Sequence, residues 1–124
     1  MRIAVSSTGK DIESNVDMRF GRCPYFIIAE IEDKKIKNIK AIQNISAMQT
    51  GGAGITAAQL IGNEDVQAVI TVNIGPKAFA VLQQLGIDIY QGSGKIKDVL
   101  SQFIDNKLTK IKAATGPTFM GTKS

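Results

Sequence analysis

The chain has 124 residues, of which 44% are hydrophobic and 21% charged, with no histidine and a single cysteine. A chain of this length is expected to form one domain. The lack of histidine excludes Ser-His-Asp and Cys-His catalysis and every zinc site that uses a histidine ligand. A lone cysteine forms no intramolecular disulfide, which favours a cytoplasmic location. No apolar run approaches the ~18 residues of a membrane helix, so we expect no membrane partner.

The net charge is +4, from fifteen Lys and Arg against eleven Asp and Glu. The basic residues are densest over 34–40, directly after Glu30, Glu32 and Asp33. This pattern is typical of a hairpin whose turn and outer face are solvated. Nucleic-acid binding favours a continuous basic stripe with interleaved aromatic residues, which this sequence lacks. We therefore expect no nucleic-acid partner.

The N-terminal half predicts three strands and a long loop. The first strand, over 2–6, leads into a turn of small polar residues, and 11–23 has no regular apolar pattern. A loop of that length in a small domain is often functional. Aromatic and β-branched residues predict a second strand over 25–31, and 36–43 returns as the other arm of a hairpin.

The C-terminal half alternates helices and strands. A glycine-bearing loop over 44–54 leads into a helix over 53–62, which is expected to pack through Ile55, Ala58 and Ile61. The apolar run 66–72 predicts a strand that is buried on both faces.

Pro76 is typical of the first turn of the next helix. Its apolar stripe is Ala78, Val81, Leu82 and Leu85, and Gly86 is expected to end it. A short strand over 87–90 and a helix over 95–106 follow, and the sequence from 112 has no periodicity. We expect a domain over 1–111 and a flexible tail over 112–124.

These elements together predict the fold class. Strands that alternate with helices pair in parallel through crossovers, whereas the hairpin adds an antiparallel edge. We predict a single α/β domain with a mixed five-stranded sheet flanked by three helices.

Ligands of open α/β sheets bind beyond the carboxyl ends of the strands. If the first strand lies beside 66–72, this crevice is lined by 6–9 and 73–75, near the loops 11–23 and 44–54. Helix N-termini favour anions, and Arg19 and Arg22 add positive charge. An anionic ligand suits this arrangement, although the glycines are also explained if they only permit tight turns.

Three known chemistries find little support. The segment 52–57 (GAGITA) fits the dinucleotide fingerprint weakly, because no strand directly precedes it and the later acidic residue is missing. A metal-dependent nuclease needs several carboxylates that converge on two cations. Asp11, Glu13 and Asp17 share one loop and are instead interpreted as solvated carboxylates. No residue is an evident general base, so we predict that the protein is not an enzyme.

Cys23 leaves two interpretations open. A lone cysteine is often a small buried hydrophobe. Arg19 and Arg22, however, would lower the pKa of a neighbouring thiol and favour the thiolate. One thiolate does not hold a metal site alone, but it can anchor a preassembled cluster that brings other ligands.

Several motifs, in order, resemble the nitrogenase iron–molybdenum-cofactor biosynthesis family, with its NifX-like carriers and the C-terminal domain of NifB-type proteins. They are 14–26 (SNVDMRFGRCPYF), 50–55 (TGGAGI), 73–79 (NIGPKAF) and 85–87 (LGI), and the resemblance spans 1–108. It implies a ribonuclease-H-like topology without a nuclease site. It also implies a carrier that binds an iron–sulfur or iron–molybdenum-type cluster and exchanges it with metallocluster donor or recipient proteins.

The resemblance also implies site residues. The family's His-Phe-Gly motif, associated with its ligand, is Arg19-Phe20-Gly21 here; arginine is no metal ligand but pairs with an anionic cluster or an organic acid. Cys23 matches a cysteine of some carriers and is the predicted metal ligand. The cofactor-binding set is Arg19, Phe20, Gly21, Arg22, Cys23, Gly51, Gly52, Gly54, Asn73 and Gly75, with no catalytic residue. The alternative function is a ligand-sensing or partner-binding adaptor that uses this crevice for a metabolite or peptide.

Overall fold

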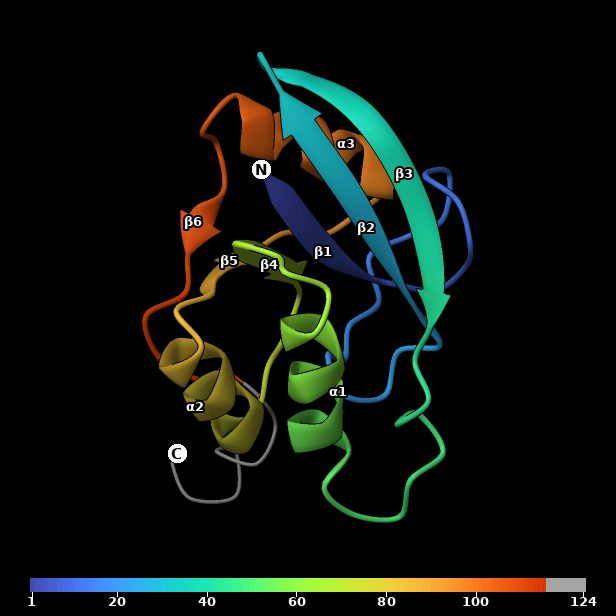
Figure 1. Cartoon of the computed structure of the whole chain (residues 1–124), viewed down its shortest axis with the longest axis vertical. Coiled ribbons are helices and arrows are strands. Elements are labelled where there is room, and N and C mark those ends of the chain that lie inside the picture. Colours follow the sequence, from blue (N-terminus) through green and yellow to red (C-terminus); the bar gives the residue numbers. More distant parts are fainter. Residues whose placement is uncertain (116–124) are drawn as a thin grey trace.

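The computed structural model describes residues 1–115. It shows a six-stranded mixed sheet with helices on both faces (Figure 1). The predicted tail therefore lies outside the described residues over 116–124. The strands are β1 (Arg2–Ser7), β2 (Tyr25–Glu32), β3 (Lys35–Gln43), β4 (Ala68–Thr71), β5 (Asp88–Gln91) and β6 (Thr109–Lys110). The helices are α1 (Ala53–Gly62), α2 (Pro76–Gln84) and α3 (Ile96–Ile104).

The strand order is β3-β2-β1-β4-β5-β6. The meander β1-β2-β3 is antiparallel, whereas β1, β4 and β5 pair in parallel because helices α1 and α2 provide the crossovers. The predicted α/β class, the mixed sheet and the three helices are confirmed. The prediction of five strands is wrong, because β6 pairs with the end of β5 in antiparallel fashion. Its two residues are exposed and give no apolar signal in the sequence.

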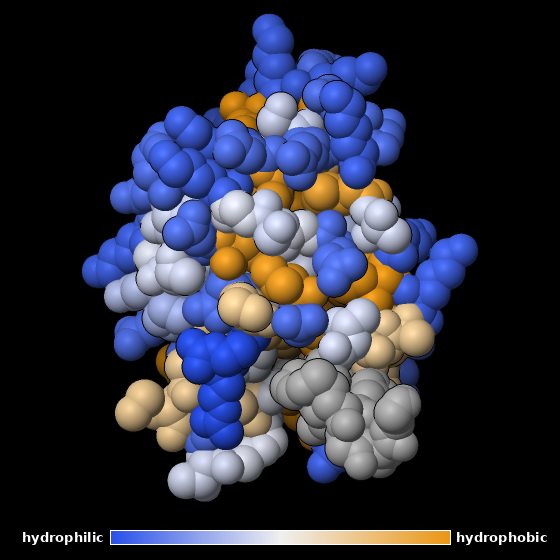
Figure 2. Space-filling view, turned by 180° about the vertical axis from the view of Figure 1, so that it is seen from behind, coloured by the Kyte–Doolittle hydropathy of each residue, from blue (hydrophilic) through white to orange (hydrophobic). Residues whose placement is uncertain are grey.

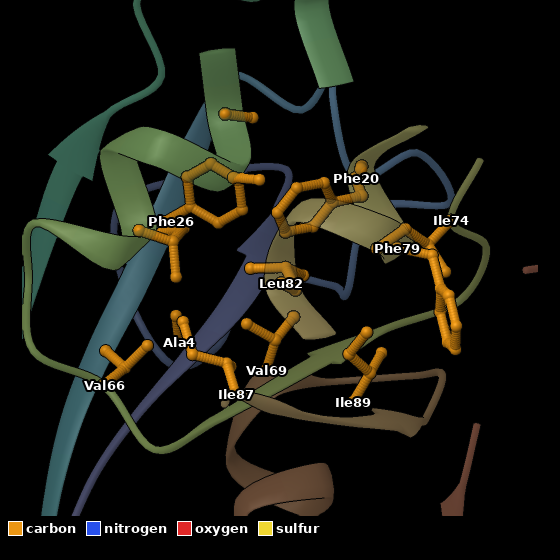
Figure 3. Close-up of a cluster of buried hydrophobic side chains, with 14 of the residues drawn as sticks. Ala4, Phe20, Phe26, Val66, Val69, Ile74, Phe79, Leu82, Ile87 and Ile89 are labelled. Atoms are coloured by element: carbon orange, nitrogen blue, oxygen red, sulfur yellow. The ribbon is translucent and has the colours of Figure 1, made fainter. Parts of the chain in front are cut away.

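Two apolar cores lie on opposite faces of the sheet. Successive residues of a strand point to opposite faces, so in β1 Ala4 joins one core while Ile3 and Val5 join the other. Helices α1 and α2 cover the core that contains Phe20, Phe26, Ile28, Val69 and Leu82 (Figure 3). Helix α3 covers the other core with Ile96, Val99 and Leu100. No helix within residues 1–115 is long and apolar enough to cross a membrane.

Helices α1 and α2 pack through small residues. A Cβ added at Gly54 of α1 would lie 3.2 Å from the Cβ of Ala78 of α2. The buried side of α1 is Ala53, Ala57, Ala58 and Ile61. Ile55, predicted to pack inward, is only half-buried, since small side chains occupy the close contact. Leu85, the last residue of the predicted stripe, is the C-cap of α2 and is 52% exposed.

Candidate functional site

A crevice opens at one end of the molecule, where three chain segments and the N-termini of α1 and α2 meet (lower end of Figure 1). Its main cavity has a volume of about 670 Å³. The lining residues come from the loop after β1, from the start of α1, from the loop after β4 and from the end of the described chain. They are Met18, Arg19, Phe20, Gly21, Arg22, Ala53, Gly54, Asn73, Gly75 and Thr115. The position beyond the carboxyl ends of β1 and β4 is the one that the sequence predicts.

Arg19 lies at the mouth of this cavity. Its backbone pairs with Asn73, which fixes the loop beside the end of β4. The carboxylate of Asp17 accepts the Arg19 backbone N–H at 2.9 Å and the Nε–H at 3.3 Å. Asp17 is buried, contrary to its interpretation as a solvated carboxylate, whereas the side chain of Arg19 is 62% exposed. The guanidinium is therefore oriented by a buried carboxylate and remains accessible to a ligand.

The hydrogen-bond partners of the Arg22 side chain are backbone carbonyl groups. Its Nη1 donates hydrogen bonds to the carbonyl oxygens of Ala47, at 3.2 Å, and of Gln49. These bonds tie the loop between β3 and α1 to the loop that carries Arg19. The two loops thus form one continuous wall of the crevice.

Gly21 is required by a close approach of that wall to α1. A Cβ added at Gly21 would lie 2.8 Å from the backbone nitrogen of Gly54 and 2.9 Å from its Cα. Real Cβ atoms do not approach backbone so closely, so any side chain at Gly21 displaces the loop or the helix. The Arg19–Gly21 loop and the N-terminus of α1 are therefore positioned by each other.

Both helix N-termini at the crevice lack side-chain caps in the described part of the chain. The N-cap residues are Gly52, in the left-handed region at φ 71°, and Gly75. A smaller cavity of about 250 Å³ lies directly over these two termini, and it shares Gly21, Ala53, Gly54 and Gly75 with the main cavity. Lys77 also lines it, and the described lining of the two cavities includes no carboxylate. First-turn N–H groups, two helix dipoles and basic side chains make this surface electropositive.

Cys23, the predicted metal ligand, lies in the core beneath the crevice and not in its lining. The residue is completely buried, and its Sγ–H donates to the carbonyl oxygen of Phe20 at 3.3 Å. Burial raises the pKa of the Cys23 thiol to about 12. The expected lowering of its pKa by Arg19 and Arg22 is wrong, because their guanidinium groups contact Asp17 and the 44–52 loop. Cys23 is therefore a protonated thiol at neutral pH.

The cavities bring together most of the predicted cofactor-binding residues. The main one collects Arg19, Phe20, Gly21, Arg22, Gly54, Asn73 and Gly75, and the smaller one adds Gly52. Gly51 is exposed and lines neither cavity. Among residues 1–115, no group of three or more Cys, His, Asp or Glu side chains is placed to hold a metal ion.

Sequence reasoning missed three lining residues. Met18 and Ala53 stand beside predicted site residues within the quoted motifs, so the same motifs could have included them. Thr115 had no signal, because it lies in the aperiodic sequence after 112. It reaches the crevice through two hydrogen bonds with the backbone of Ile74, at 2.9 and 3.1 Å.

Comparison with known proteins decides the family. The model of the family described as "dinitrogenase iron-molybdenum cofactor" matches residues 1–106. The chain belongs to this family. The resemblance to NifX-like and NifB-type proteins is thereby confirmed at the level of the family.

Individual relatives align over nearly their whole length. The uncharacterized protein MJ0580 of Methanocaldococcus jannaschii is 39% identical over 114 residues, which is 90% of this chain and 97% of the relative. The apo form of the orange protein from Desulfovibrio gigas is 30% identical, with a TM-score of 0.84 over 93% of this chain and 96% of its own. A candidate NifB protein from Thermotoga is 29% identical, with a TM-score of 0.79 over 94% and 97% of the two chains.

Proposed function

We propose that the protein is a non-enzymatic carrier that binds an anionic iron–sulfur or iron–molybdenum-type cluster in the crevice between Arg19–Arg22, the N-terminus of α1 and the Asn73–Gly75 loop. The observation that carries the proposal is the composition of this crevice. Two uncapped helix N-termini, Arg19 and Lys77 surround space in whose described lining there is no carboxylate. Membership in the iron–molybdenum cofactor family supports a metallocluster as the anion.

The chemistry of the crevice favours a preassembled cluster over a bare metal ion. A bare iron ion requires thiolate, imidazole or carboxylate ligands. The one thiol is buried and protonated, and Asp17, at the crevice mouth, is held by Arg19. A cluster that brings its own sulfide and thiolate ligands presents negative charge instead. Arg19 and backbone N–H groups can bind this charge by charge-assisted hydrogen bonds.

Cys23 was expected to ligate the metal, and we now assign it to the core that supports the Arg19–Arg22 loop. A protein that only holds its cargo needs no general base, which agrees with a carrier that exchanges the cluster with donor and recipient proteins in the cytoplasm. The strand order, with an antiparallel meander beside parallel strands, supports the ribonuclease-H-like topology that the resemblance implies.

The test is an anaerobic titration of the full chain with a preformed iron–sulfur cluster capped by small-molecule thiolates, which is an anion. We expect the protein to retain the cluster through desalting, with its charge-transfer absorption and about one cluster per chain. We also expect retention to weaken as salt is raised, because binding rests on charge.

Protein that stays colourless after this titration would contradict the proposal. A thermal-shift screen run in parallel distinguishes the alternative function. Stabilisation by nucleotides or carboxylic acids, with no response to the cluster, would identify an adaptor that uses the crevice for a metabolite.

A further inference from the structure

The loop between β3 and α1 has its polar side chains inside and its large apolar side chains outside. Asn44 and Ser46 are buried, at 3% and 0% exposure, whereas Ile45 and Met48 are 73% and 91% exposed. A loop of ordinary composition does the reverse, since burial of apolar surface stabilises the fold and burial of polar groups costs free energy unless they are hydrogen-bonded.

The inverted arrangement is fixed by hydrogen bonds. The Nδ2 group of Asn44 donates to the carbonyl oxygens of Cys23, at 2.7 Å, and of Gly21, at 3.1 Å. The hydroxyl of Ser46 is 3.1 Å from the carbonyl oxygen of Gly21 and 2.6 Å from Oδ1 of Asn44. Because these polar groups are satisfied inside, the side chain of Ile45, which lies between them, is directed to solvent.

Met48 is held outward in a similar way. The guanidinium of Arg22 binds the carbonyl oxygens on both sides of it, those of Ala47 and Gln49. Arg22 also lines the main cavity, as does Met18, whose exposure is 64%. Met18 thus lines the main cavity, and Ile45 and Met48 project from the loop that is tied to its wall at Gly21 and Arg22. We call these three exposed apolar residues the crevice rim.

The exposed charge around the crevice rim is positive, and the neighbouring carboxylate of Asp17 is buried and paired with Arg19. The sequence contains no Asp or Glu over 18–29, 34–63 or 66–87, which supply nearly all of the crevice and its rim. Arg19 and Lys77 are exposed there. Seen from behind in Figure 2, strongly hydrophilic side chains dominate the upper part of the molecule, and pale and tan side chains are more frequent toward the lower end.

We propose that the crevice rim docks a partner protein whose surface has an apolar pocket bordered by Asp and Glu. This inference rests on the proposed function, because a carrier must present its crevice to the protein that gives or receives the cluster. Complementary charge favours such a partner over a second copy of this chain, since two basic ends repel each other. Methionine suits an interface that adapts to more than one partner, because its side chain is flexible and polarizable.

A partner protein fits the rim better than a membrane surface does. The rim consists of three separate side chains, of which Met18 lines the cavity, and the loop that carries the other two is fixed by internal hydrogen bonds. Interfacial membrane binding instead uses a broad, continuous apolar face, as on an amphipathic helix. Small, discrete apolar anchors in a polar surround are typical of protein interfaces.

The experiment places a photoreactive amino acid at Met18, Ile45 or Met48 of the full chain, one position at a time, and irradiates each in extract of the native host. Leu85 is the matched control, because it is 52% exposed but lies at the far end of α2. We expect one and the same protein to crosslink at all three rim positions and not at Leu85. We expect its crosslinked segment to be apolar with flanking Asp and Glu.

The captured protein, once purified, gives the quantitative test. We expect Met48→Ser to weaken its Kd roughly tenfold, Leu85→Ser to leave Kd unchanged, and added salt to weaken binding. Four outcomes would overturn the proposal. They are crosslinks to a second copy of this chain, equal crosslinking at Leu85, absence of any shared product, and rim-dependent flotation with vesicles of anionic phospholipid.

Uptake of the preformed iron–sulfur cluster by Met48→Ser separates this inference from the proposed function. Met48 lines neither cavity, so we expect the variant to retain the cluster as well as the wild type does. Cluster uptake without docking would reject the inference alone. Docking by a wild-type chain that takes up no cluster would reject the proposed function alone, and would leave a partner-binding adaptor.

Discussion

The two ends of the molecule differ in whether their charged side chains are paired with each other. At the end away from the crevice, Arg2 contacts Glu30 at 2.7 Å and Glu64 at 3.2 Å, and Lys40 also contacts Glu64 at 2.9 Å. At the crevice end, Arg19 and Lys77 lie beside two helix N-termini, and the described lining contains no carboxylate. The first end neutralises its own charge and stabilises the fold, whereas the second keeps positive charge available for a ligand.

The difference has a structural origin. The ion-paired end consists of strand ends and the end of α1, where long charged side chains reach each other. The crevice end consists of glycine-bearing loops and helix starts, where backbone N–H groups provide much of the positive potential. Substitutions at the first end should therefore change stability, and those at the second should change binding unless they disturb the backbone contacts.

The largest effect is expected where the backbone contact is closest. Gly21→Val should lower the free energy of unfolding by about 2–3 kcal/mol, because its Cβ would meet the backbone of Gly54 at under 3 Å. It should also abolish cluster retention, since α1 would be displaced. Gly51→Ala is the control, because a Cβ there meets nothing within 4 Å. Equal urea midpoints for Gly21→Val and the wild type would contradict the role given to this contact.

The ion-paired end should respond in stability alone. Arg2→Gln removes the ion pair with Glu30 and the one with Glu64, which keeps Lys40, and should lower the free energy of unfolding by about 1–2 kcal/mol, measured in urea. Lys37→Gln is the control, because Lys37 is exposed and makes no ion pair within residues 1–115. Cluster retention should match the wild type in both variants. A binding defect in Arg2→Gln would show that the two ends are not separable.

The pH dependence of stability tests whether the Cys23 side chain belongs to the core or to the crevice. The folded pKa of Cys23, about 12, is above the ordinary thiol value of 9.0. The stability it contributes is therefore complete below pH 9 and is lost as the pH rises from 9 toward 12. By pH 10 the free energy of unfolding of the wild type should fall by roughly 1 kcal/mol, a loss that Cys23→Ala does not show. A thiol reagent that modifies the native protein at pH 8 as fast as the urea-unfolded chain would refute the buried thiol.

The smallest effect is expected at Glu13, in the half of the 11–23 loop that contacts the start of α3. Lys97 and Lys95 contact its carboxylate at 3.0 and 3.2 Å, and the first of these holds the pKa of Glu13 below its ordinary value. Lys97→Met should move that pKa back toward the ordinary value in an NMR titration. At neutral pH the stability of the variant should be only slightly below that of the wild type, because the carboxylate is exposed, and this difference should disappear as the pH falls through the pKa of Glu13. An unchanged Glu13 pKa in Lys97→Met would contradict the contact.

Much of the fold was predictable because it rests on apolar patterns. The aromatic and β-branched residues in 25–31 and the apolar run 66–72 identified the central strands, and Pro76 marked the start of α2. β6 escaped because a strand of two exposed residues has no pattern of its own and depends on its partner β5. Leu85 fitted the helical stripe of α2, but the helix ends one residue earlier.

The location of the site was predictable, whereas the chemical state of its residues was less so. Topology alone placed the Arg19 and Asn73 loops at one edge, since ends of parallel neighbouring strands meet there. The state of Cys23 was not predictable, because it depends on the burial of the thiol in the core and on arginine side chains that contact other groups. The burial of Asn44 and Ser46 in the loop between β3 and α1 also had no sequence signal. Polar residues are usual in loops, and the burial of these two depends on their contacts with Gly21.

In the proposed carrier, charge and backbone N–H groups hold the cargo, and no thiolate does. The most direct test compares anaerobic titrations of Cys23→Ala, Arg19→Gln and Arg2→Gln with the preformed iron–sulfur cluster, read by absorption and iron content after desalting. We predict that Cys23→Ala and Arg2→Gln bind like the wild type and that Arg19→Gln binds roughly tenfold more weakly. Loss of the cluster from Cys23→Ala, with full retention by Arg19→Gln, would contradict the account.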